Sequence, residues 1–325
     1  MRLLKLVPEN TNLQFLKWRN IAMAISFAMI IASIALVAVR GLNLGVDFVG
    51  GQMVRVTFKE APNLDDLRQR VGALGLGDTT IQQFGGPNEV TIRTPLPEGG
   101  EGASNKAATQ LKEAVRAGYP DAKFGSVDAV SGKVSGELFR TGTYAMVLAM
   151  IAISIYIWFR FEWQFGLGAL FALFHDVSLT FGFFALTQLE FDLNIVAAVL
   201  TIIGYSLNDT IVVFDRIREN LRKYRKMEIL PILDLSLNET LSRTLMTSLC
   251  MIVALAALLI WGPEVIFGFT AAMLLGIFIG TYSSIYMAAP ILVWAKVGPH
   301  SFVPKETGLT AGAERLGPRE SASEP

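Results

Sequence analysis

The chain has 325 residues, of which 52% are hydrophobic and 17% are charged, and its mean hydropathy is positive. This composition is too apolar for an ordinary soluble domain of this length, so it indicates an integral membrane protein. The formal net charge is zero, and the positions of the charged residues therefore carry more information than their sum.

Six apolar segments are long enough to cross a hydrocarbon core of about 30 Å at 1.5 Å per residue. In chain order they are 21–39, 141–159, 165–187, 193–214, 244–262 and 265–295. The last segment is longer than a straight span requires and contains Pro290, so we expect a tilt or a kink near its end. It also repeats Gly276, Gly280 and Ser284 at four-residue spacing, a pattern that favours close helix packing.

Lysine and arginine residues are distributed unevenly around these spans. Four precede the first span, seven lie between Arg216 and Arg243, and four lie from Lys296 onward. By the positive-inside rule, segment 1–20 and the tail 296–325 are cytoplasmic, which makes segment 40–140 a periplasmic domain. The tail is rich in Gly, Pro, Ser and charge, so we expect it to be disordered.

The predicted periplasmic domain alternates strand and helix patterns. Strands are expected at 53–58, 80–84, 90–94 and 124–130, and helices at 63–74 and 104–117. The order βαββαβ predicts a ferredoxin-like two-layer α/β domain between the first and second spans.

The segment 215–243 is predicted to be a cytoplasmic basic helical region between the fourth and fifth spans. Its first part continues the fourth span to about residue 229 with helical spacing of apolar residues. Ser236 and Glu239 match a capping box, which predicts that the next helix begins at about Leu237.

Asp209 is the residue of the fourth span that most requires an explanation. A carboxylate at helix-centre depth costs roughly 2.5 to 3.5 kcal/mol on insertion scales. A span that retains one therefore pairs it with another group, keeps it protonated or uses it in the function of the protein. Tyr205 lies on the same helical face, and Thr201 and Asn208 lie on an adjoining one. We expect this side of the helix to face protein or water. The opposite side is expected to face lipid, with Val199, Ile203 and Val213.

Two interpretations of Asp209 remain open from the residues alone. It is either a structural carboxylate paired with Arg243, at the start of the fifth span, or a group that exchanges a proton as its distance from that guanidinium changes. His175 and Asp176, in the middle of the third span, likewise fit either a proton relay or a hydrogen-bonded contact between helices.

Two motifs carry a resemblance to a known family. They are LGVDFVGG at 44–51, just outside the first span, and GYSLNDTIVVFDRIREN at 204–220. Shorter matches occur at 161–163, 175–176, 190–194 and 241–244, so the similarity extends from the first span to the sixth. On these residues the chain resembles the SecF family, membrane subunits that assist the bacterial Sec protein-export channel.

The resemblance implies six transmembrane helices that form half of a resistance-nodulation-division (RND) permease, paired with a SecD-like subunit in the bacterial inner membrane. It further implies the SecYEG channel, YajC, YidC and an unfolded preprotein as partners, and the proton gradient, with no cofactor, as the energy source. Asp209 and Arg243 occupy the positions of the family's proton-coupling carboxylate and its basic neighbour. Asp47, Gly50 and Gly51 lie at the junction of the first span and the domain, either as a hinge or as a simple strand-entry turn.

Neither an enzyme nor a nucleic-acid-binding protein is indicated. The sequence contains no Walker loop, zinc-ligand spacing or nucleophile elbow, and the basic residues near the spans suit topology and membrane-lipid contacts. Two alternatives to the SecF-type function stay open: a non-transporting scaffold of the channel, and a small-molecule or lipid exporter of the RND superfamily.

Overall fold

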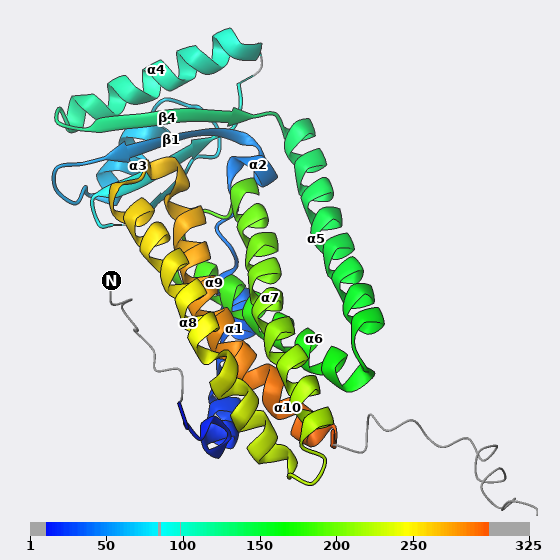
Figure 1. Cartoon of the computed structure of the whole chain (residues 1–325). Coiled ribbons are helices and arrows are strands. Elements are labelled where there is room, and N and C mark those ends of the chain that lie inside the picture. The colour runs from blue at the N-terminus through cyan, green and yellow to red at the C-terminus, as the bar shows by residue number, and fades with distance from the viewer. Residues whose placement is uncertain (1–10, 84–85, 98, 299–325) are drawn as a thin grey trace, which may run out of the picture.

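The computed structural model describes residues 11–83, 86–97 and 99–298. A bundle of long helices carries a small α/β domain at one end (Figure 1). The tail 296–325, for which we predicted disorder, lies almost entirely outside the described residues.

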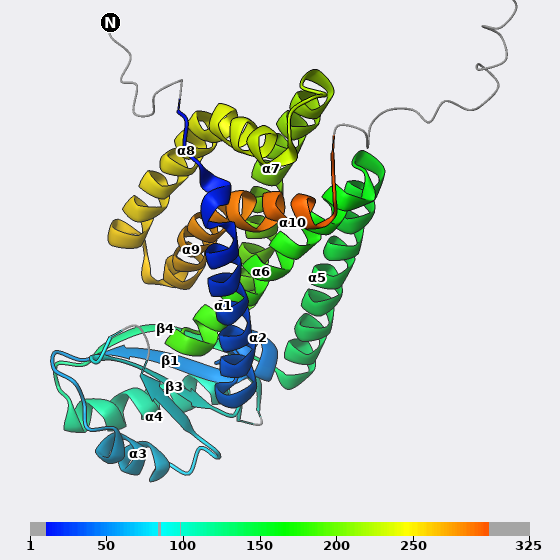
Figure 2. The same ribbon diagram turned by 90° about the horizontal axis from the view of Figure 1, so that it is seen from below.

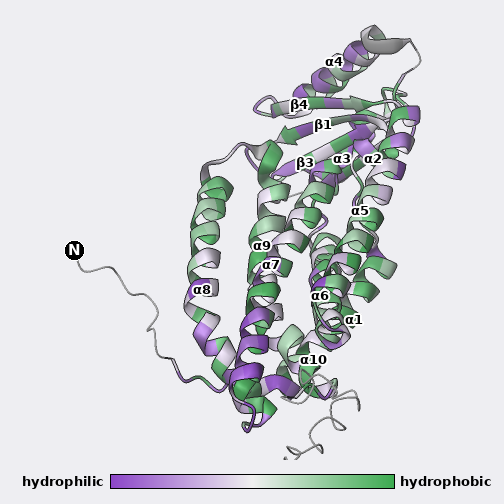
Figure 3. Cartoon of the chain, turned by 45° about the vertical axis from the view of Figure 1, so that its right-hand side comes forward, coloured by the Kyte–Doolittle hydropathy of each residue, from purple (hydrophilic) through white to green (hydrophobic). Residues whose placement is uncertain are grey.

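Six helices of the described chain are long and apolar enough to cross a membrane, as predicted. Their bounds are α1 Arg19–Arg40, α5 Gly132–Arg160, α6 Trp163–Thr187, α7 Leu193–Lys223, α8 Ile229–Trp261 and, as a sixth span, α9 Phe267–Ser283 continued by η3 Ser284–Ala288 and α10 Ala289–Trp294. Apolar residues cover the middle of the bundle, and hydrophilic ones gather at the end opposite the domain, where α7 and α8 meet (Figure 3).

The sixth span changes its helical geometry near its end. Residues Ser284–Ala288 form a π-helical turn, and Pro290 follows at the start of α10. Proline lacks the N–H that an uninterrupted helix requires and its ring crowds the preceding turn, which explains why the regular hydrogen-bond pattern changes here.

The lipid-facing side that the sequence suggested for α7 is wrong. Val199, Ile203 and Val213 are each 1% exposed, whereas Thr201 and Asn208 are exposed. The apolar side of α7 packs into the core formed with α6 and α9. Helical periodicity separates two faces of a helix, but it does not say which apolar side meets protein and which meets lipid.

The capping-box prediction is also wrong. The 215–243 region is two helices, because α7 ends at Lys223 and α8 begins at Ile229. Ser236 therefore lies inside α8, where its hydroxyl donates to the Ile232 carbonyl at 2.7 Å. Glu239 instead accepts hydrogen bonds from Arg216 and Asn220 of α7, each at 2.7 Å, and so fastens the two helices together.

The α/β domain has the predicted βαββαβ order. Its elements are β1 Gly51–Thr57, α3 Leu64–Gly72, β2 Thr80–Gln83, β3 Glu89–Thr94, α4 Gly100–Gly118 and β4 Lys123–Val130. The strands form an antiparallel sheet in the order β2-β3-β1-β4. The helices α3 and α4 cover the sheet face that points away from the bundle (Figure 2), and their core includes Val54, Leu67 and Leu111.

Residues of the predicted junction connect α1 to this sheet. A short helix, α2 Val46–Val49, is followed by Gly50 and Gly51 with φ angles of 78° and 106°. A Cβ on Gly50 would lie 3.0 Å from the Ser135 hydroxyl, and one on Gly51 would lie 2.8 Å from the Thr94 carbonyl oxygen. Both positions therefore require glycine for backbone conformation and for space.

Replacement of Gly51 by alanine is expected to destabilise the domain by about 1–3 kcal/mol, because the new Cβ would occupy a strained backbone position against the neighbouring strand. Hydrogen exchange at the β1 and β3 amides of the purified full chain measures this loss. Gly72→Ala is the matched control, since a Cβ there meets no atom within 4 Å, and helix propensity predicts no loss. Equal protection in both variants would contradict this role for Gly51.

Candidate functional site

Asp209 of α7 is buried between three spans. Its side chain is 8% exposed, and its two oxygens accept hydrogen bonds from Thr244 of α8 at 2.6 Å and Ser284 of the π-helical turn at 2.7 Å. Each carboxylate oxygen thus has a hydroxyl donor from a different neighbouring helix, which compensates part of the cost of its burial.

Arg243 does not hold this carboxylate in an ion pair. The side chain is exposed, and the pair is absent from the salt bridges of the described residues, although Arg243 interacts electrostatically with Asp209. The neighbouring residue Thr244 makes the direct contact instead. The sequence located both charged groups in the right region, but it did not identify the hydroxyl groups that bind the carboxylate.

Asp176 and His175 of α6 form a second buried group. Both are 0% exposed, and the His175 Nδ1 atom lies 2.8 Å from Asp176 Oδ1. The other oxygen, Oδ2, accepts hydrogen bonds from the hydroxyls of Ser206 on α7 and Ser283 on α9. Within the described chain, His175 Nε2 is a buried nitrogen without a hydrogen-bond partner.

The two carboxylates are connected through adjacent serines. Ser283 donates to Asp176 and Ser284 donates to Asp209, and these serines lie where α9 passes into the π-helical turn. A π-helical turn shifts the register of a helix and is frequent at functional sites. A movement of this turn relative to α6 and α7 would therefore change the hydrogen bonds of both acids together.

The hydroxyl partners of the two acids could have been found in the sequence from one signal, namely serine and threonine residues within apolar spans. Packing at Gly276 and Gly280 is as predicted, because a Cβ at either position would collide with Ile202 or Ser206 of α7. The third member of that pattern, Ser284, also supplies a hydrogen bond to Asp209, so the pattern has a chemical role as well as a packing role.

The other polar residues that the sequence placed beside Asp209 on α7 divide into two groups. Tyr205 is half-buried, and its hydroxyl lies 3.1 Å from that of Ser248, which in turn lies 2.7 Å from the Thr281 hydroxyl. Thr201 and Asn208 are exposed on the surface of the chain. Only the first group belongs to the internal network around Asp209.

The junction residue Asp47 contacts the helix that carries Asp209. Its Oδ2 accepts a hydrogen bond from the backbone N–H of Leu193 at 3.1 Å, and Asp192 accepts one from Ile195 N–H at 3.0 Å. Two carboxylates thus satisfy N–H groups in the first turn of α7, where the helix dipole favours negative charge. The short helix α2 is in this way attached to α7.

Charged residues on the inner face of the sheet attach the domain to the loop between α6 and α7. Arg55 of β1 contacts Glu190 at 3.1 Å and Asp128 at 3.3 Å, and Arg93 donates to the Leu44 carbonyl at 2.6 Å. Burial raises the pKa of Glu190, and Arg55 opposes that shift. Burial also raises the pKa of Asp192, and the nearby negative charge of Asp47 adds to this increase.

Comparison with known proteins gives consistent results. The family model described as protein export membrane protein SecD/SecF, C-terminal, matches residues 110–298, and the SecD/SecF GG motif matches residues 35–62. Protein translocase subunit SecF of Rhodobacter capsulatus is 46% identical over 303 residues, which cover 90% of this chain and 91% of that protein. The corresponding subunit of Desulfurispirillum indicum is 42% identical over 88% of this chain and 93% of its own length.

Solved structures agree with these sequence matches. The crystal structure of SecDF, a translocon-associated membrane protein from Thermus thermophilus, superposes with a TM-score of 0.79 at 31% identity, and the match covers 90% of this chain and 40% of that longer one. SecDF in a super-membrane-facing form matches with a TM-score of 0.60 at 29% identity, over 88% of this chain and 39% of the other.

Six spanning helices, an α/β domain between the first two and carboxylates inside the bundle define a multi-pass membrane protein with the architecture of half an RND-type permease. The chain belongs to the SecD/SecF family of protein export membrane proteins, and the relatives named above are SecF subunits of protein translocase. The alternative of a small-molecule or lipid exporter is therefore set aside.

Removal of the Ser284 hydroxyl is expected to lower the free energy of unfolding by about 1–3 kcal/mol, because it leaves one oxygen of buried Asp209 without a donor. Chemical denaturation of the purified Ser284→Ala variant measures the change. Ser154→Ala is the control, since that hydroxyl donates only to the Met150 carbonyl of its own helix, and a change within about 0.5 kcal/mol is expected there. Similar losses in the two variants would argue against a specific contribution from Ser284.

The raised pKa of Glu190 predicts how stability depends on pH. The folded state holds the proton more tightly than the unfolded state, so this contribution is fully present below the ordinary pKa of 4.5 and is lost as pH rises through the raised value. Thermal unfolding of Glu190→Gln should therefore show a weaker decline in stability with rising pH than the parent chain, and Asp192, whose pKa burial also raises, contributes to the part that is left.

The exposed residue Asp78 provides a control for this pH experiment. The Asp78→Asn variant should retain the full pH dependence of the parent chain. An unchanged slope in Glu190→Gln would show that this carboxyl group does not titrate between the two states.

Proposed function

We propose that the chain is a SecF-type accessory subunit of the Sec translocase, which uses the proton motive force, together with a SecD-type subunit, to promote late-stage preprotein export across the bacterial inner membrane. The observation that carries this proposal is Asp209, a carboxylate buried within a span and held by hydroxyl groups instead of a salt bridge. A carboxylate in such surroundings is suited to gain and lose a proton, since neither state has to break an ion pair.

The hydrogen bonds of Ser284 suggest how protonation would alter the structure. The hydroxyl donates to Asp209 and also lies 3.0 Å from the carbonyl oxygen of Thr281 in its own helix. When Asp209 accepts a proton, Ser284 can donate to that carbonyl instead, and the contact between α7 and the π-helical turn weakens. The Ser283 hydroxyl, which donates to Asp176, has a similar second acceptor, because it lies 3.2 Å from the Gly280 carbonyl oxygen.

The helix α7 provides a route from this event to the α/β domain. Its first turn, about 24 Å from Asp209 at 1.5 Å per residue, is bound by Asp47 of the junction. A displacement of α7 along or about its axis would therefore act on α2 and on the glycine pair that leads into β1. In this proposal Gly50 and Gly51 form the hinge, and the domain contacts the emerging preprotein.

The exposed side of α7 is the surface we assign to the SecD-type half. Thr201, Gly204 and Asn208 lie on one exposed stripe, where small and polar side chains suit a close helix contact inside a membrane. The proposal places both termini in the cytoplasm and the domain in the periplasm, with the SecYEG channel, YajC and YidC as further partners. Arg243, exposed in this chain, would lie at the rim of the same interface.

The energy available per proton is sufficient for a conformational bias. One charge that crosses 100 mV is worth about 2.3 kcal/mol, and 1.4 kcal/mol already corresponds to a tenfold change in an equilibrium. One proton per cycle could thus change the equilibrium constant between two states of the half-permease by well over tenfold.

Asp209→Asn is expected to abolish the part of preprotein export that depends on the proton gradient, because asparagine preserves size but cannot take up a proton. Export into sealed vesicles, with and without an imposed gradient, measures the effect. Asp215→Asn is the matched control on the same helix, since Asp215 is a partly exposed acid paired with Arg160 at 2.8 Å, and it should keep the gradient-dependent component.

The same experiment separates the proposal from the scaffold alternative. A scaffold predicts that Asp209→Asn leaves gradient-dependent export intact, while removal of the whole subunit abolishes it. Undiminished export by a correctly assembled Asp209→Asn complex would refute the proton-coupling role of this residue.

A further inference from the structure

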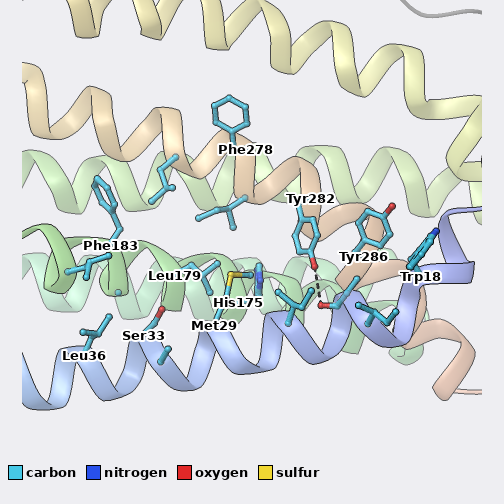
Figure 4. Close-up of a pocket in the computed structure, with 18 residues that line it drawn as sticks. Trp18, Met29, Ser33, Leu36, His175, Leu179, Phe183, Phe278, Tyr282 and Tyr286 are labelled. Atoms are coloured by element: carbon cyan, nitrogen blue, oxygen red, sulfur yellow. Dashed lines mark hydrogen bonds between the residues drawn. The ribbon is translucent and has the colours of Figure 1, made fainter.

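A groove of about 740 Å³ lies between α1, α6 and α9 (Figure 4). We call it the α1–α9 groove. It extends from Trp18 at one end of the bundle to Leu36 and Leu186 at the other. Its walls are almost entirely apolar, with Ile25, Met29, Leu179, Phe183, Phe278 and Tyr282 among them. Its size is within the range of small-molecule sites in proteins, which is roughly 300–1,000 Å³.

One polar group of this groove lacks a partner. His175, at the midpoint of α6, lines the groove, is 0% exposed and has no hydrogen bond at Nε2 in the described chain. Figure 4 shows its ring beside Met29 and Leu179, with Tyr282 on the opposite helix. A buried polar atom without a partner costs roughly 1–3 kcal/mol, so a bound group that supplies the missing hydrogen bond would be stabilised here.

The bond between His175 and Asp176 determines which kind of group fits. Asp176 Oδ2 accepts hydrogen bonds from Ser206 and Ser283, so a proton on this carboxyl group belongs on Oδ1. Two proton arrangements then leave the pair without net charge, which the membrane interior strongly favours. In one, an imidazolium faces a carboxylate; in the other, a protonated carboxyl donates to Nδ1 of a neutral imidazole. Nε2 carries a hydrogen in both arrangements. The unpartnered atom is therefore a donor, and the missing group is a hydrogen-bond acceptor.

The depth and the surroundings of this donor further restrict which ligands can bind. Ester oxygens of phospholipids lie in the interfacial region, outside the hydrocarbon core of about 30 Å, whereas His175 lies at the midpoint of its span. The Tyr282 ring lies 6.1 Å from the His175 ring at an interplanar angle of 31°, so an aromatic surface is available to a flat headgroup. The side chain of Met29 lies beside the His175 ring (Figure 4), and methionine is flexible enough to move aside.

We propose that the α1–α9 groove binds a membrane-soluble amphiphile with a planar carbonyl headgroup on a long apolar chain, the chemistry of an isoprenoid quinone. A carbonyl oxygen accepts the hydrogen bond from His175 Nε2, and the apolar chain occupies the groove between α1 and α9. Asp209 does not line this groove, and the proposal does not depend on the function proposed above.

Decylubiquinone is the probe for this site, titrated into the purified full chain together with its SecD-type partner. Binding is measured by the shift in thermal unfolding temperature, and the site is mapped by cross-linking with an azido-quinone. The parent chain should bind the quinone and cross-link on α1, α6 or α9. His175→Phe, which keeps a planar ring but removes the donor, should weaken binding about tenfold, the equivalent of one hydrogen bond.

A second pair of variants tests the groove without altering the buried pair. Ile25→Trp fills the groove and should reduce affinity at least tenfold, whereas Ile31→Trp, on the outward side of the same helix, should leave it unchanged. Ile25 lines the groove and is 52% exposed, while Ile31 is 66% exposed and does not line it. Unchanged affinity in Ile25→Trp would overturn the location of the site.

Two further ligands test the headgroup chemistry. Decylbenzene has a chain and a ring but no carbonyl, so it should bind the parent chain more weakly and be insensitive to His175→Phe. An acyl ester of matched chain length should compete poorly with the quinone. The proposal fails if decylbenzene binds as well as decylubiquinone, if the ester displaces the quinone, or if His175→Phe leaves quinone affinity unchanged.

Discussion

Hydrogen bonding of two carboxylates inside a medium that cannot solvate them is the constraint on which the rest of the bundle depends. Asp176 and Asp209 must obtain their donors from the protein, because lipid supplies none. The donors are hydroxyls on α7, α8, α9 and the π-helical turn. Since each acid on one helix requires a hydroxyl on another, these hydrogen bonds fix how α6, α7, α8 and α9 lie against one another.

The close packing of α7 and α9 follows from this requirement. A serine hydroxyl is short, so the backbones must approach closely before it can reach a carboxylate on the neighbouring helix. Gly276 and Gly280 permit that approach, because neither position has room for a Cβ. The π-helical turn then places the adjacent residues Ser283 and Ser284 toward different acids, so the two buried carboxylates share one structural element.

The junction with the α/β domain uses the same helix for a different purpose. At the first turn of α7, Asp47 and Asp192 satisfy backbone N–H groups, while Arg55 and Arg93 bind the adjacent loops from the sheet side. The domain is thereby attached to α7 by directional hydrogen bonds and ion pairs as well as by the covalent chain. This arrangement provides the physical connection that the proposed coupling between membrane and domain requires.

The sequence by itself determined the six spans, the βαββαβ order and the position of the anomalous acid Asp209. These features depend on local quantities, namely the length of apolar segments, the period of the hydrophobic pattern and the charge of a single residue. Only the tertiary structure decided which side of α7 is buried, that Thr244 and Ser284 bind Asp209 in place of Arg243, and that Ser236 lies inside a helix. Each of these depends on a neighbour far away in the sequence, and neither periodicity nor spacing contains that information, because a polar or apolar face shows only that a partner is needed and not which segment supplies it.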